Sequence, residues 1–224
     1  MRRVSVPELL DSDAGSESEL REAFADLKRV NRWLGGTSAT LTMLDRVMDH
    51  APGRELSVLE VASGMADTPR AAVERAGRRN IVLRATCLDR SLSHLQNGAP
   101  SVVGDALHLP FADESFDVVS CGLFAHHLEP AAMVRFAQEA LRVARTALLI
   151  NDLARSYLHL AMVWIARPLW RSRITRHDSV ASVWRSYTGD ELRALLQQAG
   201  PERVDIERYY FFRVGAIAWK KPSS

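Results

Sequence analysis

Hydrophobic and polar residues follow a helical period in the first part of the chain. Between residues 19 and 33, apolar side chains recur at helical spacing, as at Leu20, Phe24 and Leu27. This spacing predicts an amphipathic helix, and the pair of glycines that follows it is typical of a helix end. Residues 37–50 repeat the pattern and predict a second helix.

Beyond residue 55 the pattern changes to short apolar runs that alternate with helical stretches. The apolar runs, which predict strands, cover residues 56–61, 81–88, 116–121, 147–151, 203–207 and 210–219. The helical stretches include residues 68–76, 130–142 and 188–199. This alternation is typical of a parallel sheet with helices on both faces. The last two runs are too close for a crossover helix and predict an antiparallel hairpin.

One segment of about 36 residues, 152–187, does not fit the alternation because it is too long for a simple connection. It joins an aromatic-rich, helix-like part, 157–170, to a charged part, 171–185. We interpret it as a helical lid inserted over a ligand pocket, because such pockets are lined mainly by apolar and aromatic side chains. The aromatic residues expected to cover the pocket are Tyr157, Trp164, Trp170 and Trp184. The apolar part is too short and too interrupted to span a bilayer.

The expected organisation is a flexible N-terminus over 1–18, helices over 19–50 packed on the core or the pocket, and one α/β domain over 51–224. The length of 224 residues and the 47% hydrophobic content suit one globular core. A net charge of +2 gives no support to nucleic-acid binding. The N-terminus lacks the apolar stretch of a signal peptide, so we expect a soluble, cytoplasmic protein, either a monomer or a homodimer.

Polar residues follow the predicted strands where a ligand would bind. Glu60 ends the run 56–61 and leads into a loop of small residues, 62–66, the geometry of a nucleotide site. Asp89 follows the next run and can accept hydrogen bonds from ribose hydroxyls, or it can act only as a helix N-cap. Asp105 follows a glycine and can also be a turn former.

The order of these elements resembles that of the class I S-adenosylmethionine-dependent methyltransferases, in particular the small-molecule, type 11-like methyltransferase domain. Residues 104–119 resemble the third and fourth motifs of that family, and the resemblance extends from about Leu56 to the C-terminus. It implies a Rossmann-like, doubly wound α/β sheet of seven strands, mostly parallel with an antiparallel C-terminal hairpin. It also implies S-adenosylmethionine as cofactor and S-adenosylhomocysteine as product.

The resemblance assigns cofactor contacts along the edge of the sheet. The loop after Glu60 would meet the methionyl part, Asp89 the ribose and Asp105 the adenine amine, and the stretch 120–124 would close over the sulfonium. The implied cofactor-binding residues are Glu60, Ala62, Ser63, Gly64, Asp89, Arg90, Asp105, Ala106, Leu107, Cys121 and Gly122. The chain departs from the family at Ala62 and Ala66, where glycines are usual, and at Glu60, where aspartate is commoner.

Histidines supply the candidate catalytic groups. Methyl transfer to oxygen can need a base, and the ring of His126 or His127 suits that role after the strand 116–121. The same histidines can instead order the loop. His177, next to Asp178, is a third candidate, with a solvated loop or a lid-anchoring salt bridge as the alternative. The two cysteines, Cys87 and Cys121, lack metal-ligand spacing, and we expect no metal.

The predicted function is methylation of a small, largely apolar or aromatic metabolite, at oxygen, of the kind found in secondary metabolism. One alternative is carbon methylation of a quinone-like or polyketide precursor, and another is a non-catalytic cofactor-binding scaffold. A group of arginines in the insertion suits a carboxylate, a phenolate, peripheral contact with a membrane surface, or only a solvated face. These are Arg167, Arg171, Arg173 and Arg176.

Overall fold

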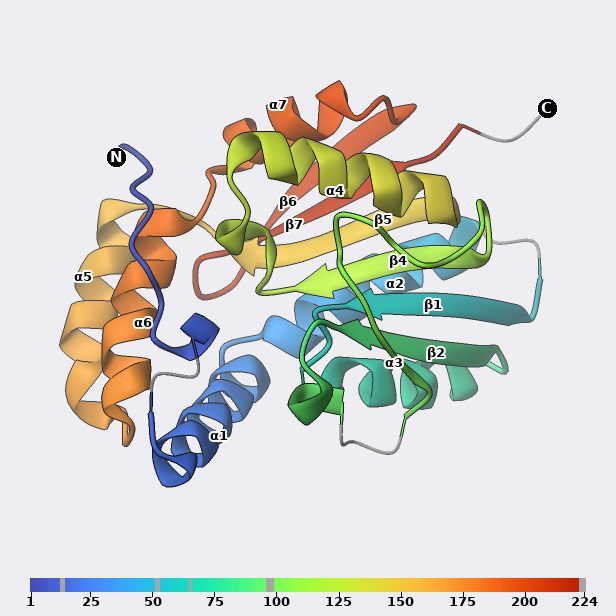
Figure 1. The fold of residues 1–224 in the computed structure, drawn as a ribbon. Coiled ribbons are helices and arrows are strands. Elements are labelled where there is room, and N and C mark those ends of the chain that lie inside the picture. Colours follow the sequence, from blue (N-terminus) through green and yellow to red (C-terminus); the bar gives the residue numbers. More distant parts are fainter. Residues whose placement is uncertain (13–14, 51–52, 65, 96–98, 222–224) are drawn as a thin grey trace.

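A computed structural model describes residues 1–224 apart from 13–14, 51–52, 65, 96–98 and 222–224. Its centre is a seven-stranded sheet in the order β3-β2-β1-β4-β5-β7-β6 (Figure 1). The strands are β1 Glu55–Val61, β2 Val82–Asp89, β3 Ser101–Val103, β4 Phe116–Gly122, β5 Ala144–Leu153, β6 Arg203–Tyr209 and β7 Arg213–Trp219. Strands β1 to β5 pair in parallel, whereas β7 is antiparallel to both β5 and β6. The predicted sheet and hairpin are therefore confirmed.

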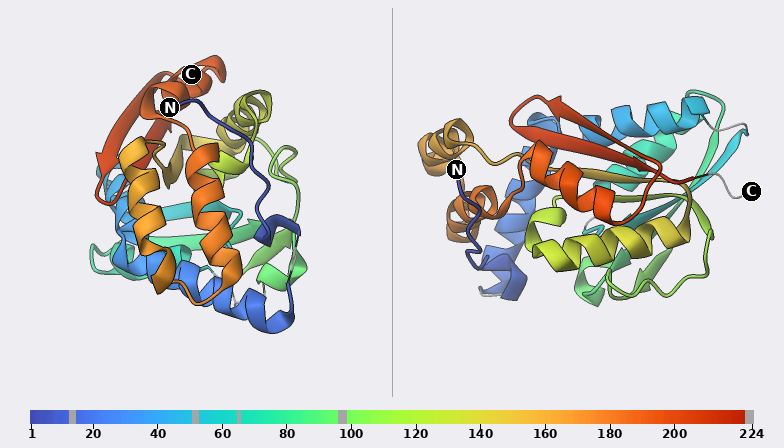
Figure 2. Two further views of the ribbon diagram at one scale, coloured as in Figure 1. Left: turned by 90° about the vertical axis from the view of Figure 1, so that its left-hand side faces the viewer. Right: turned by 90° about the horizontal axis from the view of Figure 1, so that it is seen from above.

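Helices cover both faces of this sheet (Figure 2). On one face α2, Gly36–His50, packs on β5 and β7, and α3, Asp67–Gly77, packs on β2. On the other face α4, Pro130–Val143, packs on β4 and β5, and α7, Gly189–Gln198, packs on β6. Fully buried apolar side chains of the central strands pack against the helices on each face. The hydrophobic core therefore has two halves, one on each face of the sheet.

A helical cap lies beyond the C-terminal ends of the strands. It contains α1 Glu17–Trp33, α5 Tyr157–Ala166 and α6 Arg173–Arg185, and α6 packs on both of the other helices (Figure 2). Short 3-10 turns complete the fold: η1 Leu10–Ser12, η2 Leu92–Leu95, η3 Ala125–His127 and η4 Arg167–Leu169. The interrupted alternation at 152–187 therefore corresponds to α5, η4 and α6. Within the described chain, no helix combines the length and apolar character needed to cross a membrane.

The N-terminal residues, for which the sequence predicts a flexible segment, contact α6 and the loop after β4. Residues 1–12 run alongside α6 (Figure 1), and the backbone N–H of Val4 donates to the carbonyl of Trp184. The Arg3 guanidinium donates to the carbonyls of Leu128 and Arg185 at 2.9 and 2.6 Å. The partners lie more than a hundred positions away in the chain, so local polarity could not reveal them. Residues 13 and 14 lie outside the described part.

Candidate functional site

The cavity and the predicted residues

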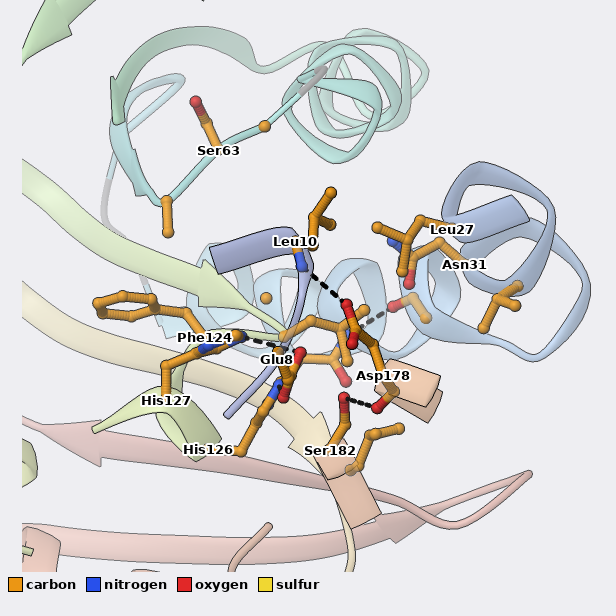
Figure 3. A pocket seen from close by; sticks show the side chains of 18 of the residues that line it. Glu8, Leu10, Leu27, Asn31, Ser63, Phe124, His126, His127, Asp178 and Ser182 are labelled. Atoms are coloured by element: carbon orange, nitrogen blue, oxygen red, sulfur yellow. Dashed lines mark hydrogen bonds and ion pairs between the residues drawn. The ribbon is translucent and has the colours of Figure 1, made fainter. Parts of the chain in front are cut away.

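A cavity of about 810 Å³ lies between the strand ends and the helical cap (Figure 3). Most of the predicted site residues line it. These are Glu60, Ala62, Ser63, Gly64, Asp89, Arg90, Asp105, Ala106, Leu107, Gly122, His126 and His127. Two predicted residues do not: the Cys121 side chain belongs to the hydrophobic core, and His177 lies outside the lining. The sheet therefore brings both acids, Asp89 and Asp105, to one cavity.

The loop after β1 keeps a glycine-like backbone although it contains alanines. Ala62 and Ala66 have φ angles of 53° and 54°, and Gly64 between them has 49°. This left-handed region costs an L-residue free energy that glycine does not pay. A Cβ built at Gly64 would meet no atom within 4 Å, so the loop leaves open space on that side. The loop therefore keeps the left-handed backbone of a glycine-rich loop, and its two alanines make that conformation less favourable in free energy.

Asp89 joins this loop to the end of β2. Its carboxylate accepts hydrogen bonds from the backbone N–H of Gly64 at 3.3 Å and of Ser91 at 3.0 Å. Only 8% of the residue is exposed, yet it lines the cavity. The carboxylate therefore holds the loop in place and also forms part of the cavity wall.

Asp105 is more accessible than Asp89. Its carboxylate accepts from the backbone N–H of Leu107 at 2.9 Å and lies 3.3 Å from Nδ1 of His108. The turn-forming role weighed from the sequence is therefore present. It leaves 59% of the side chain exposed, so part of the carboxylate remains available to a ligand.

Glu60 is a buried acid at the tip of β1. Burial raises its pKa to about 7, and the Ser120 hydroxyl opposes this shift only in part. Burial therefore favours the protonated form of this acid, which can both donate and accept a hydrogen bond at the cavity wall.

The histidine cluster

His126 is clamped between two carboxylates. Its Nδ1 lies 2.7 Å from Oδ1 of Asp152, and its Nε2 lies 3.4 Å from Oε1 of Glu8 (Figure 3). Burial alone would lower the pKa of His126, but Asp152 and Glu8 outweigh burial and raise it to about 10. Both ring nitrogens face carboxylates, and the raised pKa favours the protonated ring. This arrangement favours the loop-ordering alternative for His126 over a role as base.

His127 lies beside it with a different set of contacts. Its Nδ1 is 3.0 Å from Oδ1 of Asp11, its Nε2 is 3.9 Å from Glu8, and its ring stacks on Phe124. The side chain is 23% exposed and lines the cavity. Of the three predicted histidines, His127 is thus the one whose ring is accessible at the cavity.

Two acids of this cluster, Glu8 and Asp11, were missed by the sequence analysis. Arg185 binds both: its Nη1 lies 3.0 Å from Oδ2 of Asp11 and 3.7 Å from Oε1 of Glu8. Ligating atoms of Glu8, His126 and His127 lie close enough together to consider a metal ion. The protonated ring of His126 and the guanidinium of Arg185 oppose a cation here, so we assign no metal to this cluster.

Asp178 anchors the N-terminal segment to α6. It accepts hydrogen bonds from the backbone N–H groups of Leu9 and Leu10 at 2.8 and 3.0 Å (Figure 3). The Nδ1 of His177 lies 2.8 Å from Asp178, on the outer side, with 45% of its side chain exposed. This pair matches the lid-anchoring alternative rather than a catalytic pair.

The apolar wall of the cavity is shared between the insertion, the strand ends and α1, one of the N-terminal helices expected to pack on the core or the pocket. Of the aromatic residues expected to cover the pocket, only Trp170 lines it, whereas Tyr157 and Trp164 are 70% and 54% exposed. Besides Trp170, the insertion contributes Val163 of α5 and Ile174 of α6 to the lining. Part of the apolar lining comes from α1. Its residues Ala23, Phe24, Leu27 and Val30 line the cavity, together with Leu34 just after the helix.

Similarity to known proteins

Residues 53–147 match a family model described as a methyltransferase domain. The comparison with curated protein sequences gives no match. The match covers strands β1 to β4 and the histidine loop.

Solved structures share the fold at low sequence identity. A SAM-dependent methyltransferase from Aquifex aeolicus has a TM-score of 0.60 at 17% identity, over 86% of this chain and 93% of its own. The plantazolicin methyltransferase BpumL, in complex with SAH, has 0.68 at 11% identity, over 92% of both chains. The methyltransferase SibL has 0.68 at 12% identity, over 98% of this chain and 64% of its own. The family match and the shared fold support the predicted class, an S-adenosylmethionine-dependent methyltransferase of class I.

Proposed function

We propose that this protein transfers a methyl group from S-adenosylmethionine to an oxygen atom of a small, largely apolar acceptor. The observation that carries the proposal is the meeting of Asp89, Asp105 and His127 at one cavity. The first two are the acids expected to hold the adenosine, and the third is an accessible base candidate. Among the structural neighbours, BpumL acts on plantazolicin, which is consistent with a natural-product acceptor.

The residues present suit this cofactor. Asp89 offers a buried carboxylate for the ribose hydroxyls, Asp105 a half-exposed one for the adenine amine, and the loop at Gly64 leaves room for the methionyl part. When bound, the cofactor supplies a methyl group on a positively charged sulfur, which a nucleophile displaces directly. The loop and its acids have only to hold it in line with the acceptor.

The helical cap performs the remaining tasks. The apolar residues of α1 hold the acceptor against the strand ends and exclude water, which aligns the reacting atoms. The proton of the acceptor hydroxyl passes to Nε2 of His127, whose Nδ1 is held by Asp11. His126 positions this loop, because its backbone N–H donates to Asp152 at 2.9 Å.

Calorimetry with S-adenosylhomocysteine, followed by product analysis over a panel of phenols and enols, tests the proposal. We expect cofactor binding and a methyl ether as product. A product methylated at carbon, with its hydroxyl free, would favour the carbon-methyltransferase alternative. Binding without turnover on any acceptor would favour the scaffold, and absence of binding would reject all three.

A further inference from the structure

An unpaired buried arginine

Two buried arginines near the cap differ in their partners. Arg155 donates to Glu191 at 2.5 Å and to the carbonyls of Ser186 and Met1 at 2.6 and 3.0 Å. Arg213, which is 1% exposed, has one hydrogen bond, from Nη2 to Oδ1 of Asn31 at 2.9 Å. Its Nε and Nη1 have no hydrogen-bond partner among the described residues. These two atoms carry most of the five N–H donors of a guanidinium.

An unpaired guanidinium in such a place is costly. Burial lowers the pKa of Arg213 to about 10, and the nearby Asp152 opposes this shift, so the group stays charged at neutral pH. Removing a charge from water costs several kcal/mol unless a counter-charge compensates it. The position is also tightly enclosed, since a Cβ on Gly36 would lie 2.8 Å from Nη2. Asp152 compensates this charge only in part, and the donors on Nε and Nη1 are left for a ligand in the cavity.

The position of Arg213 indicates which ligand supplies that partner. It begins β7, opposite Leu153 of β5, and it lines the cavity together with Asn31 and His159. Asp89, by contrast, ends β2, and the strands β1, β4 and β5 lie between β2 and β7. The guanidinium is thus on the acceptor side of the cavity, away from the acids expected to hold the adenosine.

We propose that Arg213 forms an anion subsite that binds a carboxylate of the methyl acceptor. Carboxylates match the planar donor array of a guanidinium, and charged hydrogen bonds of this kind are strong in a buried site. The acceptor is then an organic acid with an apolar body, which lies against α1 while its acid group meets Arg213. The assignment of this carboxylate to the methyl acceptor rests on the proposed function.

The first test measures the thermal stability of the ligand-free protein. We expect Arg213→Met to raise Tm by a few degrees, because it removes an uncompensated charge and keeps the volume. The matched control, Arg155→Met, breaks a buried ion pair and should lower Tm. A fall in Tm for Arg213→Met as large as for the control would mean that the protein already satisfies Arg213, and would overturn the subsite.

The second test uses protein saturated with S-adenosylhomocysteine and the probes 4-hydroxybenzoate and 3-hydroxy-2-naphthoate, each paired with its neutral primary amide. We expect the wild type to bind at least one acid at least tenfold more tightly than its amide. Arg213→Met should lose this preference, and Arg213→Lys should keep part of it. A wild type that does not distinguish acids from amides overturns the proposal.

A carboxylate bound by Arg213 can belong to the methyl acceptor or to the methionyl part of the cofactor. The affinity for S-adenosylhomocysteine distinguishes these two sources. If Arg213→Met leaves that affinity unchanged, the subsite serves the acceptor, as proposed. If the affinity falls tenfold or more, Arg213 holds the methionyl carboxylate and the acceptor assignment is wrong. Failure of the wild type to bind S-adenosylhomocysteine at all would instead reject the proposed function, and the acid preference would then be measured on the free protein.

An apolar outer face on the cap

The outer face of the cap carries a second, independent feature. Large apolar side chains of α5 and η4 project outward with 49–74% exposure: Tyr157, Leu158, Met162, Trp164, Ile165 and Leu169. A helix that is apolar on all sides is normally buried all round. Next to it, Phe212 of the β6–β7 turn stacks on His159, and Tyr210 and Phe211 of the same turn are 87% and 56% exposed.

The charge of this region indicates an anionic partner. Between Asp152 and Asp178 the sequence contains five arginines and no acidic residue. Arg155 is buried against Glu191 and Arg173 pairs with Glu19, so the basic groups of the outer face are Arg167, Arg171 and Arg176. Arg171 is exposed, and Arg167 lies over the ring of Trp164 at 4.3 Å. We infer that this face docks on an anionic lipid bilayer, with the apolar side chains at the boundary between headgroups and acyl chains.

Sedimentation with phosphatidylcholine vesicles, with and without phosphatidylglycerol, tests the docking. We expect binding that needs the anionic lipid and that is lost in the double variant Ile165→Glu, Leu169→Glu, while the control Val73→Glu on α3 keeps it. Arg171→Glu should weaken binding at least about 5-fold, equivalent to ~1 kcal/mol for one basic residue near the surface. Absence of vesicle binding, or self-association through this face in analytical ultracentrifugation, overturns the inference.

Discussion

The Nδ1 atom of His126 lies 2.7 Å from Oδ1 of Asp152, and both side chains are almost completely buried. Glu8 faces the other ring nitrogen, so one imidazolium joins the end of β5 to the N-terminal segment. The imidazolium stabilises this attachment of the N-terminal segment to β5 only while Asp152 and Glu8 both remain ionised. The pKa values of Asp152 and Glu8 are lowered accordingly: burial opposes the shift in each, but the contacts with His126 outweigh it.

The first prediction concerns the pH dependence of stability. The folded-state pKa of His126, about 10, lies above its ordinary value of 6.5. Its contribution to stability is therefore fully present below pH 6.5 and is lost as the pH rises through 10. Chemical unfolding between pH 6.5 and 10 should show a decline in the free energy of unfolding that His126→Gln reduces. The exposed His177→Gln should keep the wild-type slope, and identical slopes in all three proteins would contradict the buried cation.

The second prediction concerns the attachment of residues 1–12. Glu8→Gln removes a buried carboxylate from His126 and Arg185, and we expect a loss of up to about 3–5 kcal/mol in the free energy of unfolding, the range for removing one partner of a buried ion pair. Hydrogen exchange should also become faster at the amides of Leu9 and Leu10, which Asp178 holds in the wild type. The control Glu17→Gln, at a side chain that is 90% exposed, should change neither quantity. Unchanged exchange in Glu8→Gln would mean that Asp178, with the contacts of Arg3 and Val4, holds the segment without Glu8.

The third prediction concerns the strained alanines after β1. Because Ala62 and Ala66 have left-handed backbones, replacing either by glycine should raise the free energy of unfolding by roughly 0.5–1 kcal/mol. The same change at Ala71, inside α3, should lower it by about 1 kcal/mol. Urea unfolding of the three variants measures both effects. Destabilisation by Ala66→Gly would show that the left-handed backbone of Ala66 does not lower the free energy of unfolding.

The sequence predicted the sheet well because its signals are local. Apolar runs and short connections define most strands, whereas β3, with three half-exposed or exposed residues, has no apolar run to reveal it. The sequence analysis began the last strand at residue 210, which is wrong. Phe211 and Phe212 have φ angles of 56° and 59° and form the turn before β7.

The site was predicted where it lies along strand tips, and missed where it depends on distant contacts. Asp89 and Asp105 could be placed from the ends of successive strands. The partner of His126 in the N-terminal segment, Glu8, is separated from it by more than a hundred residues, and its polar surroundings indicated only a flexible tail. Arg213 gave no signal either, since an arginine at the start of a strand is ordinarily exposed.

The last prediction ranks the two acids of the cofactor end. Asp89→Asn should weaken binding of S-adenosylhomocysteine by about 1.5–3 kcal/mol, because a buried carboxylate that receives loop amides loses its charged hydrogen bonds. Asp105→Asn should have a smaller effect, since its side chain is 59% exposed and water competes for the ligand. Asp113→Asn, at a side chain that is 76% exposed and paired with Arg142, is the matched control and should leave the affinity unchanged. Calorimetry at constant pH measures all three. Equal affinities in wild type and Asp89→Asn would remove Asp89 from the binding site, and with it the assignment of the β2 tip as the place where the ribose is held.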